Sequence, residues 1–548
     1  MKREISLITQ TNMKLKNIIY LCLILLSGQL FSQQLNYPLA KPFSNDMEQV
    51  LYSSEVYFHT AVKPWLIPEI NKIINMDSLK NIILIKSNYN SNFCNSAWDK
   101  IFNENLIIIN KQEFKMTIDP VINFELGKDI RINNDLKFVN TRGVLAEGSI
   151  GKDFSFSSTF YENQSTFIDY LDSNIRKVTV VPGQGPIKEF KGSGFDYAWA
   201  SAYISYTPSK YFNFQFGHGK NFIGDGYRSL LLSDNAFNYP YLKISTNVWR
   251  FKYINLYGEF QDLKTLHSYD LGYRKKYGTF HYLSFAASKR VNIGIFESVI
   301  WKAEDSTGFR GFDINYLNPV IFFRPVEFSL GSPDNALMGL NISTKIGKSY
   351  VAYGQLLIDE FKIHEVMSGN GWWGNKQAFQ LGVKAFDLFT VNNLFLQSEF
   401  NFVRPYTYSS RSSLQNYGHY NQALAHPLGA NFWESVNFIK YNYKRFFIEL
   451  KYSYALYGAD TANIDFGQDI FQSYNNYPKE FSNYTGQGLE TILTYKDFRI
   501  SYLVNPSTNL NISLGISDRT ETTSLYDKHS TFVYFGIRTS LHNFYYDF

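Results

Sequence analysis

Alternation of apolar and polar residues with a period of two dominates the chain from about residue 114 to its end. Successive residues of an extended strand point to opposite faces, so this pattern predicts strands with one apolar and one polar face. The predicted strands cover residues 114–126, 136–149, 154–164, 197–206, 211–219, 241–247, 250–260, 279–288, 292–301, 336–346, 350–359, 376–386, 392–404, 434–443, 446–457, 488–504, 510–518 and 530–548. About eighteen strands, an even number, are typical of a bacterial single-chain barrel, and sixteen is the alternative.

The final stretch, residues 532–548, reads FVYFGIRTSLHNFYYDF and ends on an aromatic residue. The alternation places Phe544, Tyr546 and Phe548 on one face, where they would form an aromatic edge at the level of the lipid headgroups. We therefore predict that this stretch is the strand that closes the barrel against the first one. The alternative is a soluble sandwich that ends on an edge strand.

Short and long connections alternate between the predicted strands. The short ones are rich in Gly, Pro, Ser and Asp, which form tight turns, and we expect them on the periplasmic side. The long ones are expected to face outward, as the loops of such barrels do. The short turns include 151–153, 207–210, 288–290, 347–349 and 505–509, and the long loops are 165–196, 220–240, 302–335, 405–433 and 459–487.

Residues 33–112 lack the period of two. Four apolar residues instead fit one face of a helix, namely Met47, Val50, Leu51 and Phe58. We predict a small, mainly helical periplasmic domain over 33–112, followed by the barrel with inward-folded extracellular loops over 113–548. The alternative is a plug or a long extension inside the barrel.

The start of the chain has the features of a secretory signal. Lys14 and Lys16 precede an uncharged run over residues 18–30, and we expect cleavage after Ser32, which makes 1–32 the signal peptide. Cys22 lies in that run without the small neighbours of a lipoprotein site. The mature chain then keeps one cysteine, Cys94, so no internal disulfide can form.

Composition agrees with a membrane barrel. The chain is 18% aromatic and 18% charged, with 48 Phe, 41 Tyr and a formal net charge of +5. This aromatic excess suits half-buried strands and interfacial girdles and excludes disorder and nucleic-acid binding. The mature chain has no run of about 18 apolar residues, so a closed barrel is the expected way to span the membrane. These features predict the outer membrane as the location and its lipid as a partner.

The stretch 217–247 is the most informative of the long connections. Four glycines give its backbone freedom, and the apolar triplet 230–232 within a loop needs cover, so we predict that Leu230, Leu231 and Leu232 fold into the lumen. The polar candidates for ligand binding or for holding the loop are Asp225, Tyr227, Arg228, Asp234 and Asn235. The carboxylates and Arg228 can bind sugar hydroxyls, or Arg228 can form an ion pair with Asp225 or Asp234 that holds the loop, which we favour.

Trp372 and Trp373 stand in a predicted outer loop, in the sequence GWWG. Their flat rings can stack on sugar faces, but the interpretation we favour is that they anchor the loop at the headgroup level.

Catalytic motifs are weak. Asp225 follows Gly224 where a phosphate-binding loop would carry lysine, and His364-Glu365 lacks the second histidine of a zinc protease. Fragments of the penicillin-recognising motifs at 149–152 and 233–235 lack their third element. With 9 scattered histidines no metal cluster emerges. We therefore expect a protein that is not an enzyme and has no cofactor and no metal.

The stretch 217–247, Tyr316-Leu317-Asn318-Pro319 and the group 332–336 together resemble the Wzi-type capsule-assembly barrels and, more closely, the gliding-motility proteins of the RemB type. Resemblance to the former implies an eighteen-stranded outer-membrane barrel with a periplasmic helical part that holds exopolysaccharide at the cell surface. Resemblance to the latter implies a part in movement over surfaces. Candidate partners are thus exopolysaccharide and other envelope or motility proteins.

Three classes of function remain open from the sequence. A surface protein for polysaccharide assembly or attachment and for gliding motility is favoured by the inward-folded loops and the resemblance. A porin for small solutes is the alternative that the barrel alone predicts. An outer-membrane hydrolase lacks a catalytic constellation.

Overall fold

The computed structural model describes residues 34–40, 45–76, 83–84, 92–131, 135–266, 272–305, 308–323, 334–360, 362–462 and 464–548. The predicted signal peptide, with Lys14, Lys16, Cys22 and Ser32, lies outside these residues. So do Ser332 and Pro333 of the stretch 332–336.

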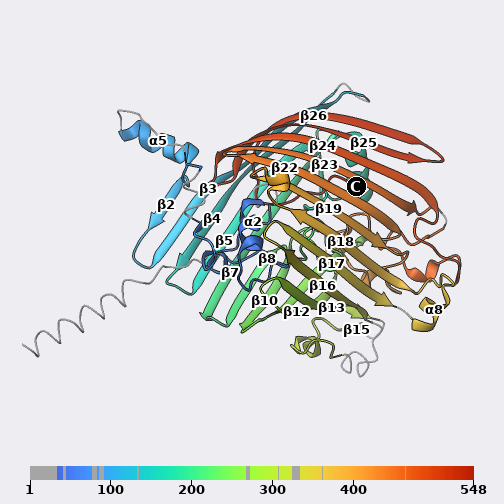
Figure 1. Cartoon of the computed structure of the whole chain (residues 1–548). Coiled ribbons are helices and arrows are strands. Elements are labelled where there is room, and N and C mark those ends of the chain that lie inside the picture. Colours follow the sequence, from blue (N-terminus) through green and yellow to red (C-terminus); the bar gives the residue numbers. More distant parts are fainter. Residues whose placement is uncertain are drawn as a thin grey trace, which may run out of the picture.

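The described chain forms a closed barrel of 18 antiparallel strands, drawn in sequence colours in Figure 1. Its wall consists of β3 (Phe114–Asp129), β4 (Leu136–Ile150), β5 (Phe154–Thr166), β7 (Gly194–Ser209), β8 (Phe212–Gly219), β10 (Tyr239–Val248), β11 (Phe251–Leu266), β12 (Tyr273–Ala286), β13 (Val291–Lys302), β16 (Asn335–Ile346), β17 (Tyr350–Glu360), β18 (Lys376–Ala385), β19 (Leu394–Val403), β22 (Phe432–Tyr443), β23 (Phe446–Ala459), β24 (Leu489–Asn505), β25 (Leu510–Thr523) and β26 (Asp527–Thr539). The eighteen-strand prediction is confirmed.

The wall is apolar outside and polar inside, as β19 shows. Its residues alternate between buried and partly exposed along the whole strand. The buried set faces the lumen and includes Gln397, Glu399 and Asn401, whereas the outward set includes Leu396 and Phe400. A barrel with this arrangement faces lipid and not water. A soluble sandwich is therefore excluded.

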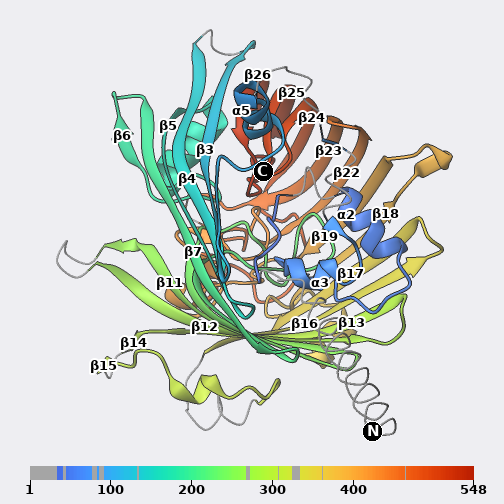
Figure 2. The ribbon, with the colours of Figure 1, turned by 90° about the vertical axis from the view of Figure 1, so that its left-hand side faces the viewer.

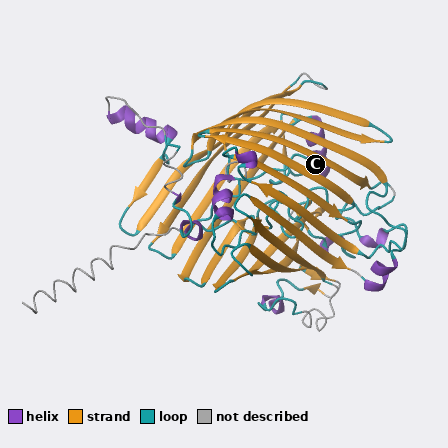
Figure 3. Ribbon diagram, in the orientation of Figure 1, coloured by secondary structure: helices purple, strands orange, loops and turns teal. Residues whose placement is uncertain are grey.

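The remaining elements are short and lie inside the barrel, at its ends or outside the wall, as the helices of Figure 3 show. They are α2 (Asn45–Ser53), β1 (Val62–Lys63), α3 (Ile67–Asn71), α5 (Asn92–Phe102), β2 (Ile107–Asn110), α6 (Asp169–Val178), β6 (Lys188–Phe190), β9 (Phe222–Ile223), β14 (Glu304–Asp305), β15 (Gly308–Phe309), η2 (Ile314–Leu317), α8 (Ile363–Ser368), η3 (Leu388–Thr390), η4 (Ser413–Gln415), β20 (Gly418–His419), β21 (Gln422–Ala423) and η5 (Tyr474–Asn476). Among the described residues no helix is long and apolar enough to cross a membrane.

The described residues of the N-terminal segment, 34–40 and 45–76, lie inside the barrel, where Figure 2 shows α2 and α3 within the ring of strands. The lumen-facing side chains of the wall hold it: Lys384 Nζ lies 2.6 Å from Glu48 Oε2, and Lys252 Nζ lies 2.7 Å from Glu69 Oε2. The segment also has a small core of its own, which includes Met47 and Leu51.

These contacts correct the expectation of a separate periplasmic domain for the segment 34–76. Of the predicted helical face, Met47, Val50 and Leu51 lie on α2, whereas Phe58 lies beyond its end at Ser53 and joins the same cluster from an irregular segment. Helical periodicity does not say what the helix packs against. The helix α5 fits the expectation better, because it lies outside the wall beside the short turn after β24. There Asn505 Nδ2 donates to the carbonyl oxygens of Lys100 and Glu104.

The end of the chain also departs from the prediction. β26 does close the barrel against β3. The paired residues run from Phe532 opposite Asp129 to Arg538 opposite Asn123. The strand ends at Thr539, however, and residues 540–548 turn into the lumen. The predicted aromatic edge of Phe544, Tyr546 and Phe548 is therefore wrong: Tyr546 and Phe548 pack against a buried cluster around α6, and Phe544 lies against Trp199. We call residues 540–548 the C-terminal tail.

Candidate functional site

The loop between β8 and β10 folds into the lumen and fills its centre. Its short strand β9 pairs with β1 of the N-terminal segment. Leu230, Leu231 and Leu232 are each 0% exposed and belong to the main core cluster, which confirms that the triplet folds inward. Tyr408 and Tyr417 of the 404–431 loop cover the triplet by donating hydrogen bonds to the carbonyls of Leu230 and Leu231.

Arg228 ties this loop to the wall and to the C-terminal tail. Its Nη2 lies 2.9 Å from Glu434 Oε1 on β22 and 3.0 Å from Asp547 Oδ2 in the tail. Lys451 on β23 lies 2.7 Å from the same Asp547 oxygen. Burial alone would raise the pKa of the Asp547 carboxyl, but the charges of Arg228 and Lys451 hold it below its usual range. The expected pairing of Arg228 with Asp225 or Asp234 is wrong.

Asp225 and Asp234 have neutral partners instead. Asp225 accepts hydrogen bonds from Tyr52 and Thr60 of the N-terminal segment and from Asn341 of β16. Asp234 accepts from Asn543 and Tyr545 of the tail. Both carboxylates therefore join separate parts of the chain inside the barrel.

Tyr227 and Asn235 also hold the loop in place. The backbone N–H of Tyr227 donates to Glu399 Oε2 at 2.7 Å, and its hydroxyl lies 3.2 Å from Asp547 Oδ2. Asn235 Nδ2 donates to the carbonyl of Ala423 at 2.9 Å. The five polar candidates thus hold the loop inside the barrel as one assembly, in which Tyr227, Arg228 and Asp234 contact the tail and Asp225 and Asn235 contact other segments.

Trp372 and Trp373 lie in the extracellular loop between β17 and β18, and among the described residues their rings contact loop residues and not the five polar candidates. Trp373 stacks on Tyr477, with ring centroids 4.5 Å apart, and its backbone N–H donates to the carbonyl of Glu480. Lys362 Nζ lies 4.4 Å from the ring of Trp372. The pair joins two outer loops, and one face of Trp373 is already occupied.

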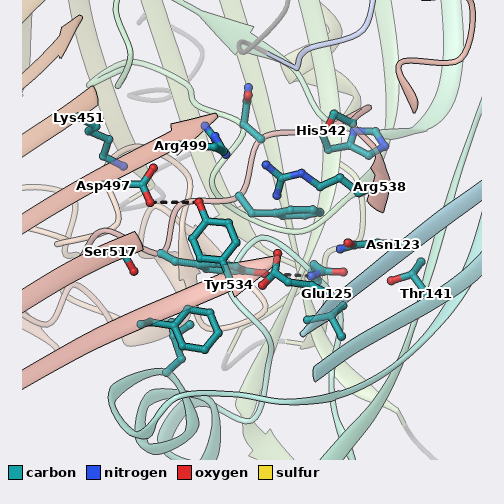
Figure 4. Close-up of a pocket in the computed structure, with 18 of the residues that line it drawn as sticks. Asn123, Glu125, Thr141, Lys451, Asp497, Arg499, Ser517, Tyr534, Arg538 and His542 are labelled. Carbon is teal, nitrogen blue, oxygen red and sulfur yellow. Dashed lines mark hydrogen bonds between the residues drawn. The ribbon is translucent and has the colours of Figure 1, made fainter. Parts of the chain in front are cut away.

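A cavity of about 250 Å³ lies inside the barrel beside this assembly. β3, β4 and β5 line one side and β22 to β26 the other, while α6 and the C-terminal tail complete it. Figure 4 shows Lys451, Asp497 and Arg499 on one side and Asn123 and Thr141 on the opposite side.

Three residues that line the cavity carry a buried polar atom without a partner. Among the described residues, Arg538 Nε, Asn123 Oδ1 and His542 Nε2 are buried and have no hydrogen-bond partner. Burial, and next the charge of Lys220, lower the pKa of His542 to about 3, so its imidazole is neutral and can either donate or accept. Asp497 accepts a hydrogen bond from Tyr534 at 3.2 Å. The residues around the cavity therefore hold a donor, an acceptor and one group that can be either, and no described residue pairs with them.

Aromatic rings complete the lining, and they include Tyr161, Tyr170, Tyr495, Phe544 and Tyr546. A site with flat rings and spare hydrogen-bonding groups suits a small hydroxyl-rich ligand. Of the residues singled out from the sequence as site candidates, Tyr227 alone lines this cavity. The sequence did not identify the other lining residues, because they come from strands hundreds of residues apart. A period of two shows only that their side chains face the lumen.

Within the described ranges, no three His, Cys, Asp or Glu side chains gather in a way that could hold a metal ion.

These features define the class of the protein: it is an outer-membrane β-barrel whose lumen is filled by its own segments. No family model matches the chain, and no curated protein matches it either. Among solved structures, one similar to this chain is Wzi, an outer membrane protein involved in group 1 capsule assembly in Escherichia coli, described as a carbohydrate-binding β-barrel. It has a TM-score of 0.53 and 12% sequence identity, and the match covers 91% of this chain and 98% of Wzi.

Two other solved barrels are more distant. The outer membrane protein OprD from Pseudomonas aeruginosa has a TM-score of 0.41 and 10% identity, over 81% of this chain and 99% of OprD. OccK1 of the same organism has a TM-score of 0.43 and 9% identity, over 77% of this chain and 98% of that protein. At these identities the comparison with Wzi shows the shared fold alone.

Proposed function

We propose that this barrel binds saccharide and serves the assembly or attachment of exopolysaccharide at the cell surface. The observation that carries the proposal is a cavity lined by aromatic rings and by Arg538, Asn123 and His542, each of which carries a buried polar atom without a partner among the described residues. A sugar offers hydroxyls that both donate and accept, and its apolar faces pack on rings. Wzi, which shares the fold, is a carbohydrate-binding barrel, and this supports the same class of ligand.

The filled lumen supports a binding role over transport. The N-terminal segment, the loop between β8 and β10, the 404–431 loop and the C-terminal tail all pack within the wall. The proposal keeps the expectation, drawn from the weak catalytic motifs of the sequence, that the protein is not an enzyme. A contribution to gliding motility rests on the sequence resemblance alone and would follow from holding polysaccharide at the surface.

Calorimetric titration of the folded barrel with oligosaccharides from the native envelope tests the proposal. Binding is expected, and Arg538→Gln should weaken it about tenfold or more, the equivalent of a hydrogen bond to a charged group. The matched control is Arg290→Gln. Arg290 lies in a short turn, is exposed, and pairs with Glu55, which is exposed as well. If Arg538→Gln bound the oligosaccharides as tightly as Arg290→Gln, or if the parent protein did not bind them, the proposal would be contradicted.

The porin alternative is supported by the closed barrel and by the charged groups that line its cavity. It differs from the binding proposal in requiring a continuous path for solutes through the lumen. A stable conductance is its distinguishing property.

A further inference from the structure

Three neighbouring strands of the wall, β11, β12 and β13, are buried on both faces in their middle. Consecutive residues are buried over 254–257, 278–282 and 296–301, whereas elsewhere burial alternates, as along β19. On uncovered parts of the wall, outward residues such as Phe216 and Leu381 are each 62% exposed. Something in the chain therefore covers the outer face of these three strands.

The covered face carries a row of polar groups beside a small apolar cluster that includes Val299 and Trp301. The inward set is fixed by contacts with the N-terminal segment: Lys252 pairs with Glu69, Ser284 with His59, and Asn292 with the carbonyl of Phe58. The opposite parity therefore points outward. It includes Asn255, His281 and Glu297, which are direct partners across the three strands. A row of such groups facing acyl chains would be costly, because lipid offers no hydrogen bonds.

The segment 308–323 lies on the outside of the wall in both Figure 1 and Figure 2, and its hydrogen bonds place it over this polar row. Thr279 Oγ1 donates to the carbonyl of Tyr316 at 3.2 Å, and Tyr257 donates to the carbonyl of Leu317 at 3.1 Å. We call residues 308–323 the outer flap.

Further contacts extend along the wall. The hydroxyl of Tyr253 donates to the carbonyl of Pro319, and the backbone N–H of Phe322 donates to Glu297 Oε2 at 2.6 Å. Tyr253 stands two residues after Phe251, where β11 leaves a short turn. The flap thus runs from the extracellular strand ends almost to the other end of the wall, and its irregular backbone is hydrogen-bonded by side chains of the wall.

The other side of the flap is apolar and uncovered. Its exposed apolar side chains include Phe309 at 75%, Ile314 at 74%, Val320 at 55%, Phe323 at 44% and Leu317 at 40%, and Asn315 is the exposed polar residue among them. The outward residues of adjoining strands, such as Val248 of β10 and Ile342 of β16, are apolar and exposed as well. The apolar side of the flap is therefore continuous with the lipid-facing surface of the barrel.

We propose that the outer flap is an intramembrane element that lies in the bilayer against β11 to β13 and presents Phe309, Ile314 and Val320 to acyl chains. Irregular backbone at membrane depth is tolerated where protein satisfies its hydrogen bonds, and the outward polar groups of the wall do that here. If the flap were surrounded by water, its apolar side chains would be exposed to water at the depth where the neighbouring strands span the membrane. The proposal is independent of saccharide binding.

Nitroxide labelling in lipid vesicles tests the proposal on the full mature chain. In a Cys94→Ser background, labels are attached after Ile314→Cys or Val320→Cys, and collisions with oxygen and with a water-soluble nickel chelate are measured. Lipid contact predicts frequent oxygen and rare nickel collisions at both positions. The matched controls are Met367→Cys and Leu525→Cys, at exposed apolar residues in α8 and in the turn after β25, where the reverse is expected.

Frequent nickel collisions at 314 and 320 would overturn the proposal, because they place the flap in water. Spin–spin broadening that persists when the protein is diluted with lipid would also overturn it, since a second copy would then cover the flap. The double variant Thr279→Val with Tyr257→Phe should release the flap and raise nickel collisions at 320 several-fold. Tyr206→Phe, on the uncovered outer face of β7, should change nothing, and a gel-mobility shift on heating shows that each variant is folded.

Discussion

At the scale of single residues, the interior depends on charges paired across long sequence distances. Arg228 is 2% exposed, and its partners Glu434 and Asp547 come from a wall strand and the chain terminus. The sequence predicted that the neighbouring leucines fold inward, because three apolar residues in a loop need cover. It did not predict the partners of Arg228, because acidic residues closer in sequence offered an equally plausible ion pair.

We predict that Arg228→Met strongly destabilises the barrel. The change leaves Glu434 and Asp547 buried with less compensating charge, and breaking a buried pair in this way costs about 3–5 kcal/mol. Urea unfolding in lipid vesicles, followed by tryptophan fluorescence, gives the free energy of unfolding.

The matched control for this prediction is Arg176→Met. Arg176 forms an exposed pair with Asp172 one helical turn away in α6, and such pairs contribute at most about 1 kcal/mol. If Arg228→Met proved as mild as this control, the buried network would not hold the loop and tail together.

At the scale of elements, the wall was predictable and the tail was not. Each of the eighteen predicted strands has a counterpart in the wall, because one lipid-facing and one lumen-facing side impose the period of two. The same alternation continues past Thr539, but it shows only which residues share a face. Asn543, Tyr545 and Asp547 have buried partners in the lumen, and these contacts draw the tail inward.

We therefore predict that deleting residues 540–548 leaves the barrel able to insert. The pairing of β26 with β3 does not involve these residues, so the wall can still close. Stability should fall by several kcal/mol, since each buried aromatic side chain contributes about 1.5–3 kcal/mol. Membrane fractionation and the midpoint of thermal unfolding measure the two effects.

The control deletion removes β26 as well, from Asp527 onward, and should abolish insertion. If the deletion of 540–548 alone also left the protein in the periplasm, the tail would be needed for closure after all.

At the scale of the whole molecule, the sequence indicated a barrel with inward-folded loops but not how completely its own chain fills it. The four lumen segments lie far apart in sequence and meet through contacts such as β1 with β9 and Tyr545 with Asp234. The periodicity of the sequence does not predict these contacts between distant segments. The cavity is likewise a product of closure, because its lining residues become neighbours only when β26 joins β3.

Single-channel conductance in a planar bilayer tests most directly whether this barrel is a filled binding protein. The parent protein should show no stable open current. Deleting residues 220–238, which removes the leucine triplet and Arg228, should produce one, in a variant that still shows the heat-dependent gel mobility of a folded barrel. A stable open current in the parent protein, unchanged by the deletion, would contradict the account and identify the protein as a porin.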